Sequence, residues 1–364
     1  MTQPPASAHA PLFQPLQLGP LELPNRILMA PLTRCRAEPG HVPGPLMAEH
    51  YSQRASAGLV IAEATMAMAG NSAFWSEPGI HSLEQVAGWR RVTDQVHAAG
   101  GRIFLQIWHG GRACHPLMNG GAQPVAPSAL AIQGYEIYTP DGGKAAHVTP
   151  RALEDGELPA IVAGFTSAAS NALAAGFDGV EIHGANGYLL DEFLRDGSNR
   201  RTGPYGGSLE NRARLLMEVL EATCQVWGSN RVGVRLSPLN SYNDMEDSDP
   251  IGWITGLAGM LDSLDLAYLH LMRADFTGRQ QGDVLTPARK HYRGTLIANM
   301  GYTAAEAAQA IADGRLDAVA FGTPFLANPD LPRRIALDAP LNAPDPATFY
   351  TPGPKGYNDY PTLD

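Results

Sequence analysis

Short apolar segments alternate along the chain with longer segments in which apolar residues recur every three to four positions. The first kind predicts strands and the second predicts helices. Most of the short segments are almost continuously apolar, which is typical of parallel strands that are covered on both faces. We expect eight strands, at residues 25–30, 59–64, 102–107, 179–183, 232–236, 268–272, 295–299 and 318–321.

Several of the intervening segments carry helix start signals. Ser82 begins the sequence SLEQ and Thr303 begins TAAE, and both patterns are capping boxes. Asn328 followed by Pro329 predicts a further helix start. Eight strands that are each followed by a helix or a long loop favour one closed (β/α)₈ TIM barrel over a doubly wound sheet with a second domain.

Three segments fall outside this alternation. Residues 1–11 carry no helical or strand pattern, and we expect a disordered tail before a single domain at 12–364. Residues 13–23 are apolar but broken by Gly19 and Pro20, which predicts a hairpin that would close the bottom of the barrel. Residues 110–150 are rich in turn formers, and we expect this long excursion to cover a site.

Composition and charge exclude several classes of protein. Hydrophobic residues make up 44% of the chain, which excludes a disordered or fibrous protein. The net charge is −10 and no Lys/Arg run occurs, so nucleic acid and anionic membrane surfaces are not expected partners. Cys35, Cys114 and Cys224 have no metal-ligand spacing, and the sequence has no secretion signal or membrane span, so we expect a cytoplasmic protein.

The carboxyl end of the fourth predicted strand carries the richest chemistry. The sequence HGANGY places His183, Asn186 and Tyr188 within six residues on a loop loosened by glycine. Two hydrogen-bond donors and a protonated phenol suit a carbonyl oxygen that gains negative charge and a neighbouring carbon that takes a proton. The alternative is that His183 and Asn186 satisfy loop backbone groups and Tyr188 is a core aromatic.

Polar residues inside the apolar strands are further candidates, and two of them stand out. Arg235 stands within VGVRLSP, where a permanently charged guanidinium needs a partner. That partner is either the carboxylate of Glu181 or the anionic edge of a cofactor. Gln106 is open to the same two interpretations, because a buried carboxamide can also satisfy backbone groups.

A phosphate site is expected near the last two strands of a barrel of this type. Met300 and Gly301 follow the seventh strand, and Gly322 and Thr323 follow the eighth. Their backbone amides could hold a phosphate. The sequence contains no GxGxxG fingerprint after a strand, no GxxxxGK[ST] loop and no HExxH pair, so a Rossmann cofactor domain, a P-loop and a zinc protease are not indicated.

The chain resembles the Old Yellow Enzyme flavoproteins, and in particular their bacterial N-ethylmaleimide and xenobiotic reductases. The motifs that carry the resemblance lie in one order along nearly the whole sequence. They are NRILMAPLTRCRA (25–37), HYSQRASAGLVIAEAT (50–65), QIWHGGR (106–112), VAPSAL (125–130), GFDGVEIHGANGYLLDEFL (176–194), YGGSLENRAR (205–214), VGVRLSP (232–238), FGTPFLANPDLP (321–332) and GYNDYPTL (356–363).

The resemblance implies a (β/α)₈ barrel that binds FMN and reduces the C=C bond of α,β-unsaturated carbonyl compounds, with NADPH or NADH as electron donor. Enones and maleimides are the expected small-molecule substrates, with nitroalkenes, nitrate esters and nitroaromatics as further candidates. Hydride transfer from flavin N5 and ping-pong kinetics are expected. The protein is expected to be a monomer or homodimer.

The resemblance also implies roles for individual residues. Those expected to bind FMN are Pro31, Leu32, Thr33, Ala64, Gln106 and Arg235, with Met300, Gly301, Gly322 and Thr323 around the phosphate. Those expected to bind the substrate are Trp108, His183, Asn186, Tyr188 and Tyr357. Within that set His183 and Asn186 would hold the substrate oxygen and Tyr188 would supply the proton.

One position departs from the pattern, because the resembled family commonly has an arginine where this chain has Thr323. A hydroxyl contact then replaces a charge-assisted contact, which would weaken FMN binding unless the backbone amides and the helix dipole suffice to hold the phosphate. Two other functions remain open on the residues alone. One is a non-redox barrel that acts as an isomerase or lyase on a phosphorylated substrate, and the other is a non-catalytic flavin-binding protein.

Overall fold

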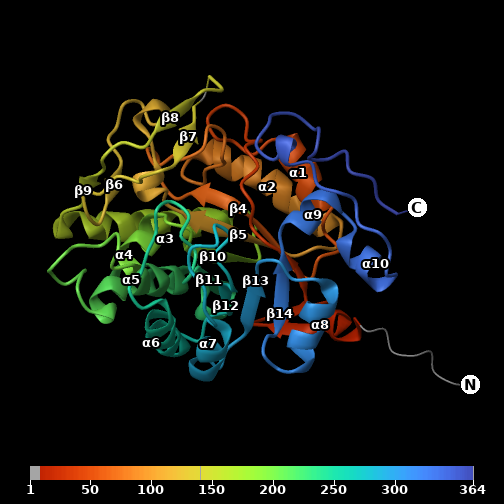
Figure 1. Cartoon of the computed structure of the whole chain (residues 1–364). Coiled ribbons are helices and arrows are strands. Elements are labelled where there is room, and N and C mark those ends of the chain that lie inside the picture. The colour runs from red at the N-terminus through yellow and green to blue at the C-terminus, as the bar shows by residue number, and fades with distance from the viewer. Residues whose placement is uncertain (1–8, 140, 364) are drawn as a thin grey trace, which may run out of the picture.

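A closed barrel of eight parallel strands organises the molecule (Figure 1). The structure is a computed structural model, and it describes residues 9–139 and 141–363. The barrel order is β10-β11-β12-β13-β14-β3-β4-β5. The strands are β3 (Ile27–Met29), β4 (Val60–Met66), β5 (Ile103–Trp108), β10 (Gly179–Gly184), β11 (Val232–Leu236), β12 (Tyr268–Met272), β13 (Leu296–Asn299) and β14 (Ala318–Phe321). The fold predicted from the sequence is confirmed.

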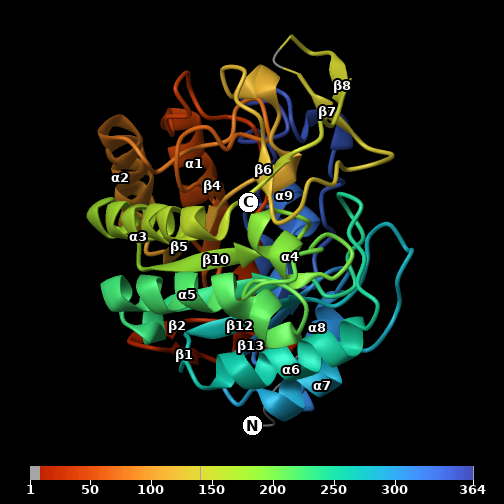
Figure 2. The same ribbon diagram turned by 90° about the vertical axis from the view of Figure 1, so that its left-hand side faces the viewer.

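Helices surround the barrel and pack against its outer face (Figures 1 and 2). They are α1 (Pro45–Ser52), α2 (Leu83–Ala98), α3 (Leu158–Ala174), α4 (Leu189–Leu194), α5 (Leu209–Trp227), α6 (Pro250–Asp262), α7 (Leu285–His291), α8 (Ala304–Ala312), α9 (Thr323–Ala327) and α10 (Leu331–Ala336). Short 3₁₀ helices are η1 (Ala10–Phe13), η2 (Gly111–Ala113), η3 (Pro116–Met118), η4 (Asp155–Glu157), η5 (Ser229–Arg231) and η6 (Pro346–Thr348). Between barrel and helices lies a continuous apolar core.

The predicted helix starts are confirmed in two of three cases. Ser82 and Thr303 each form a complete capping box at the start of α2 and α8. The third prediction is wrong by two residues, because α10 begins at Leu331 with Asp330 as its N-cap. Asn328 instead bonds two neighbouring segments, since its amide donates to the carbonyl of Pro324 and its oxygen accepts from the backbone of Asn342.

The predicted hairpin is present at the amino-terminal end of the barrel. Strands β1 (Leu16–Leu18) and β2 (Leu21–Leu23) pair antiparallel, with Gly19 in the left-handed region at φ 53°. Its leucines share an apolar cluster with inward-facing barrel residues that include Phe104 and Tyr268. The hairpin therefore closes this end with apolar side chains. Residues 1–8 of the predicted tail lie outside the described residues, whereas Ala10 and Pro11 belong to η1.

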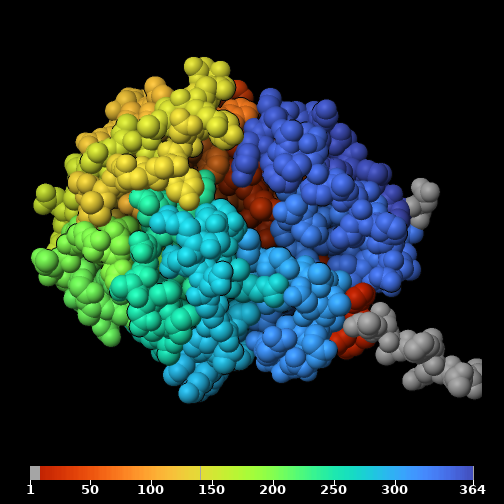
Figure 3. Space-filling view, in the orientation of Figure 1, coloured from red at the N-terminus to blue at the C-terminus, as the bar shows by residue number. Residues whose placement is uncertain are grey.

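The long excursion between β5 and α3 contains two small sheets. Strand β6 (Val125–Ala126) pairs with β9 (Arg151–Ala152), and β7 (Glu136–Tyr138) forms a hairpin with β8 (Lys144–Ala146). Figure 3 shows this excursion, in yellow, across a central hollow from the C-terminal segment, in blue. The excursion therefore forms one wall of the hollow. Within the described ranges, no helix has the length and apolar character needed to cross a bilayer.

Candidate active site

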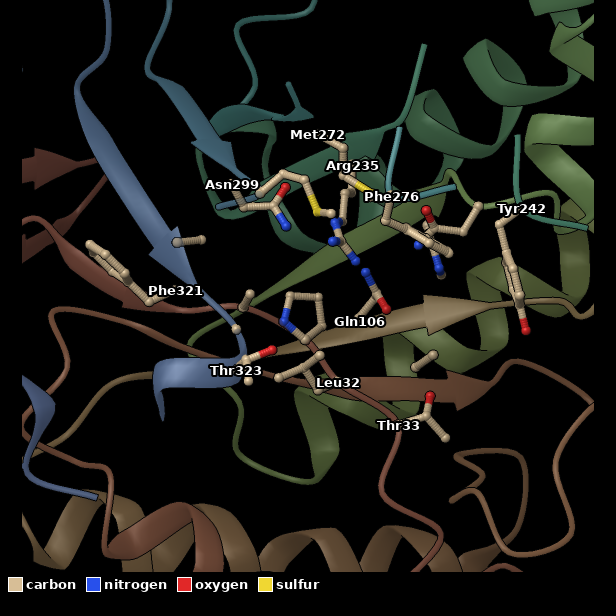
Figure 4. A pocket seen from close by; sticks show the side chains of 18 of the residues that line it. Leu32, Thr33, Gln106, Arg235, Tyr242, Met272, Phe276, Asn299, Phe321 and Thr323 are labelled. Atoms are coloured by element: carbon tan, nitrogen blue, oxygen red, sulfur yellow. The ribbon is translucent and has the colours of Figure 1, made fainter. Parts of the chain in front are cut away.

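The carboxyl ends of the barrel strands open into a cavity of about 540 Å³. Parallel strands end at the same rim, so polar residues far apart in sequence meet there. Figure 4 shows Gln106, Arg235 and Asn299 pointing toward the middle of this cavity. The predicted residues that line it are Pro31, Leu32, Thr33, Ala64, Gln106, His183, Asn186, Tyr188, Arg235, Met300, Gly301, Gly322 and Thr323.

A buried carboxylate beneath the cavity organises its floor. Glu181 of β10 accepts a hydrogen bond of 2.7 Å from Gln106 Nε2 and lies 2.8 Å from His270 Nδ1. The two carboxylate oxygens are thus taken by Gln106 and His270. Gln106 bonds this side chain rather than a backbone group.

Arg235 is buried in β11 and lacks a carboxylate partner among the described residues. The predicted alternative, an ion pair with Glu181, does not form. Arg235 Nε is buried without a hydrogen-bond partner in the described chain, and Nη2 lies 3.0 Å from the side-chain oxygen of Asn299 when that amide is oriented to accept. Burial lowers the pKa of Arg235, an effect that the charge of Glu181 partly offsets. A buried guanidinium with a free N–H needs an acceptor from a ligand.

His183 and Asn186 present neutral donors close to Arg235, since His183 is its register partner on the neighbouring strand. Burial, then the charge of Arg235, lowers the pKa of His183 well below its usual range, so the imidazole is neutral at pH 7. Asn186 has φ 61°, and its side-chain oxygen accepts a bond of 2.8 Å from Asn240 Nδ2. Because Asn240 holds that oxygen, the Asn186 amide nitrogen, which has no acceptor in the described part of the protein, is available to a ligand.

Tyr188 stands beside this pair with its ring fixed by Trp108. The two rings meet edge to face with centroids 4.4 Å apart. Tyr188 is 7% exposed, and burial raises its pKa well above the usual value of 10. The phenol therefore keeps its proton throughout the neutral range.

The far end of the cavity is formed by a turn with unusual backbone geometry. Met300 and Gly301 have consecutive positive φ angles of 92° and 68°. Arg273, a residue that sequence reasoning missed, donates from Nε to the Met300 carbonyl at 2.8 Å and from Nη2 to the Gly301 carbonyl at 3.0 Å. The carbonyls are held by Arg273, while the amides of Gly301 and Gly322 find no acceptor in the described ranges. Such a turn suits an anion.

Two predicted pocket residues lie elsewhere. Tyr357 is fully buried and does not line the cavity. Its ring stacks on His50 at 3.8 Å and has the guanidinium carbons of Arg34 and Arg36 at 5.0 and 4.8 Å from its centroid. Trp108 is also fully buried; its ring packs against Tyr188 and does not line the cavity.

Aromatic and apolar residues that sequence reasoning missed complete the walls. They come from connecting loops or from strand ends with no polar signal, and they are Phe74, Tyr242, Met272, Phe276, Tyr302, Phe321 and Tyr350. Figure 4 shows Tyr242 and Phe276 on the side opposite Thr323. No group of His, Cys, Asp or Glu residues suited to a metal ion occurs in the described ranges.

Comparison with known proteins identifies relatives over almost the whole length. The profile of the NADH:flavin oxidoreductase / NADH oxidase family matches residues 11–342. A probable flavin mononucleotide-dependent alkene reductase of Leishmania infantum is 50% identical, covering 97% of each chain. The 12-oxophytodienoate reductase 1 of Oryza sativa subsp. japonica is 45% identical, covering 99% of this chain and 95% of that protein.

Solved structures agree with these relatives. Morphinone reductase superposes with a TM-score of 0.93 and is 49% identical, covering 97% of this chain and 96% of its own. The old yellow enzyme from Trypanosoma cruzi superposes with a TM-score of 0.96 and is 45% identical, covering 98% of this chain and 100% of its own.

Proposed function

This chain belongs to the NADH:flavin oxidoreductase / NADH oxidase family. From that premise we propose that the residues around its central cavity bind FMN and the activated alkene that FMN reduces. The family and enzyme class predicted from the sequence are confirmed: the chain is an FMN-dependent ene-reductase of the Old Yellow Enzyme type, with a nicotinamide nucleotide as electron donor. The roles of individual residues and the choice of alkene are the proposal.

The observation that carries the assignment of residues is the unpartnered Nε of buried Arg235. FMN fits this requirement, because the pyrimidine edge of its ring offers acceptors to Arg235. The same edge carries an N–H that the Gln106 amide oxygen would accept, since Gln106 Nε2 already donates to Glu181. Thr33, with Pro31 and Leu32, would line the ring, and Ala64 would pack at its edge. The phosphate would rest on the amides of Met300, Gly301, Gly322 and Thr323. When bound, FMN supplies the hydride that is taken from the nicotinamide nucleotide and given to the alkene.

His183 and Asn186 would grip the carbonyl oxygen of the alkene substrate. Negative charge moves onto that oxygen as hydride reaches the β-carbon, and two fixed donors stabilise it more than they stabilise the ground state. Neutral donors suffice, in agreement with the lowered pKa of His183. Removal of one such donor typically costs about 3 kcal/mol, or roughly a hundredfold in rate.

Tyr188 would deliver the proton to the α-carbon. Its phenol is held by Trp108 and remains protonated at neutral pH, which a general acid requires. The nicotinamide and the alkene would use the same cavity in turn, which gives ping-pong kinetics. The monomeric or homodimeric state and the cytoplasmic location stay predictions.

The direct test is anaerobic incubation of the purified protein with NADPH and 2-cyclohexenone, followed by chromatography of the product. We expect cyclohexanone to form in a one-to-one ratio with the NADPH consumed. Steady NADPH consumption without cyclohexanone, or no consumption by a yellow protein, would contradict the proposal. A colourless protein that does not bind added FMN would instead favour the alternative function, an isomerase or lyase that acts on a phosphorylated substrate.

A further inference from the structure

A second, smaller cavity lies beside the proposed active site. Its volume is about 100 Å³, and we call it the side chamber. The side chamber and the main cavity share four lining residues, which are Phe74, Tyr188, Tyr242 and Tyr350. Its other lining residues include Cys35, Ala113, Tyr135, Glu136, Ile137 and His147. The β7–β8 hairpin segment thus forms one wall, and the proposed proton donor forms part of the boundary.

Aromatic rings form the boundary that the two cavities share. Phe74 and Tyr350 stack with centroids 6.0 Å apart, and Tyr135 meets Tyr242 edge to face at 5.5 Å. Burial raises the pKa of the Cys35 thiol well above its usual value, so this residue adds no charge. An apolar linker would therefore meet mainly aromatic rings at this boundary.

Among the described residues that line the side chamber, one buried side-chain polar atom has no hydrogen-bond partner. Nδ1 of His147 is buried and makes no hydrogen bond within the described part of the chain. Burial, with smaller effects from His115 and Arg112, lowers the pKa of His147 to about 4, so the imidazole is neutral at pH 7. Buried polar atoms are nearly always hydrogen-bonded, so an orphaned ring nitrogen at a cavity wall indicates a polar ligand group. A hydroxyl can serve either tautomer, because it both donates and accepts.

We propose that the side chamber binds a substituent on the α-carbon of the alkene substrate. This substituent is a short apolar chain that ends in a hydroxyl, and the hydroxyl forms a hydrogen bond with His147. This inference rests on the proposed function, in which Tyr188 protonates the α-carbon. Because Tyr188 borders both cavities, a substituent on that carbon has the most direct route into the chamber. A volume of about 100 Å³ restricts the substituent to a short chain of a few non-hydrogen atoms.

The test compares two enones of equal size, 2-(3-hydroxypropyl)cyclohex-2-enone and 2-butylcyclohex-2-enone, with 2-cyclohexenone as the reference. One buried hydrogen bond corresponds to about a three- to tenfold difference. We expect the wild-type holoenzyme to show a kcat/KM for the hydroxyl compound higher than that for the butyl compound by this factor. His147→Leu should bring the ratio to about one by raising the KM of the hydroxyl compound.

Two further variants separate binding in the chamber from general damage. His81→Leu removes a half-buried imidazole outside both cavities and should leave the ratio unchanged. Ala113→Val narrows the chamber and should lower kcat/KM for both substituted enones relative to 2-cyclohexenone. Two results would overturn the inference: a kcat/KM ratio of hydroxyl to butyl compound near one in the wild type, or a wild-type ratio that is unchanged in His147→Leu. In either case, reduction of 2-cyclohexenone would still support the proposed function. Failure to reduce 2-cyclohexenone would overturn the proposed function itself.

Discussion

Replacement of Tyr188 by phenylalanine isolates the proposed proton transfer. The substitution removes only the hydroxyl, because the ring that packs against Trp108 at 4.4 Å remains. A positioned general acid typically contributes about 10²- to 10⁴-fold, so alkene reduction should slow by at least about a hundredfold. Reduction of the protein by NADPH needs no proton from Tyr188 and should proceed at nearly the wild-type rate.

Stopped-flow measurement of the two half reactions decides the matter. Flavin absorbance is followed first on mixing with NADPH and then on mixing the reduced protein with 2-cyclohexenone, under anaerobic conditions. Tyr242→Phe is the matched control, because Tyr242 lines the same cavity but has no proposed acid role. Near-normal alkene reduction by Tyr188→Phe, or an equal loss in both half reactions, would refute the reasoning.

Three further predictions concern cofactor affinity, substrate orientation and stability. Thr323→Arg should tighten FMN binding about three- to tenfold in titrations of the apoprotein. Because Thr323 is an exposed residue of the cavity, salt should screen the new charge and reduce this gain. Unchanged or weaker binding would argue against a phosphate at this position. Asn240→Ala frees the Asn186 amide to rotate and should raise the KM for enones about two- to tenfold, and an unchanged KM would count against this positioning role. Burial raises the pKa of Glu192 from 4.5 to about 8 in the folded protein, so as pH rises the unfolded chain loses this proton first. Between pH 4.5 and about 8 the free energy of unfolding should therefore fall as pH rises, by up to about 1.4 kcal/mol per pH unit. Glu192→Gln should flatten this slope in denaturant titrations, whereas parallel curves for the two proteins would contradict it.

The barrel could be predicted because each parallel strand is covered on both faces and so appears as a short, nearly continuous apolar run. Three strands, β11, β12 and β14, have the predicted bounds. The polar residues at strand ends could be found for the same reason. Arg235 and His183 stand out against apolar neighbours, and the topology places them side by side in register.

The cavity walls could not be predicted in this way. Phe74, Tyr242 and Tyr350 come from loops, where no periodic pattern shows which side chains turn inward. Tyr357 was misplaced because its environment is tertiary: Arg34 donates to the carbonyls of Phe349 and Gly356, which draws the C-terminal segment inward and buries the ring. Arg273 was missed because its role depends on a turn made by residues from the next strand.

The most direct test of the central claim is the visible absorption spectrum of the purified protein during an anaerobic titration. We propose that a redox-active FMN binds against Arg235 and the group formed by His183, Asn186 and Tyr188. The purified protein should therefore show flavin bands that are bleached by one equivalent of NADPH and restored by one equivalent of 2-cyclohexenone. Bands that are absent even after FMN is added, or that NADPH bleaches and 2-cyclohexenone fails to restore, would contradict it.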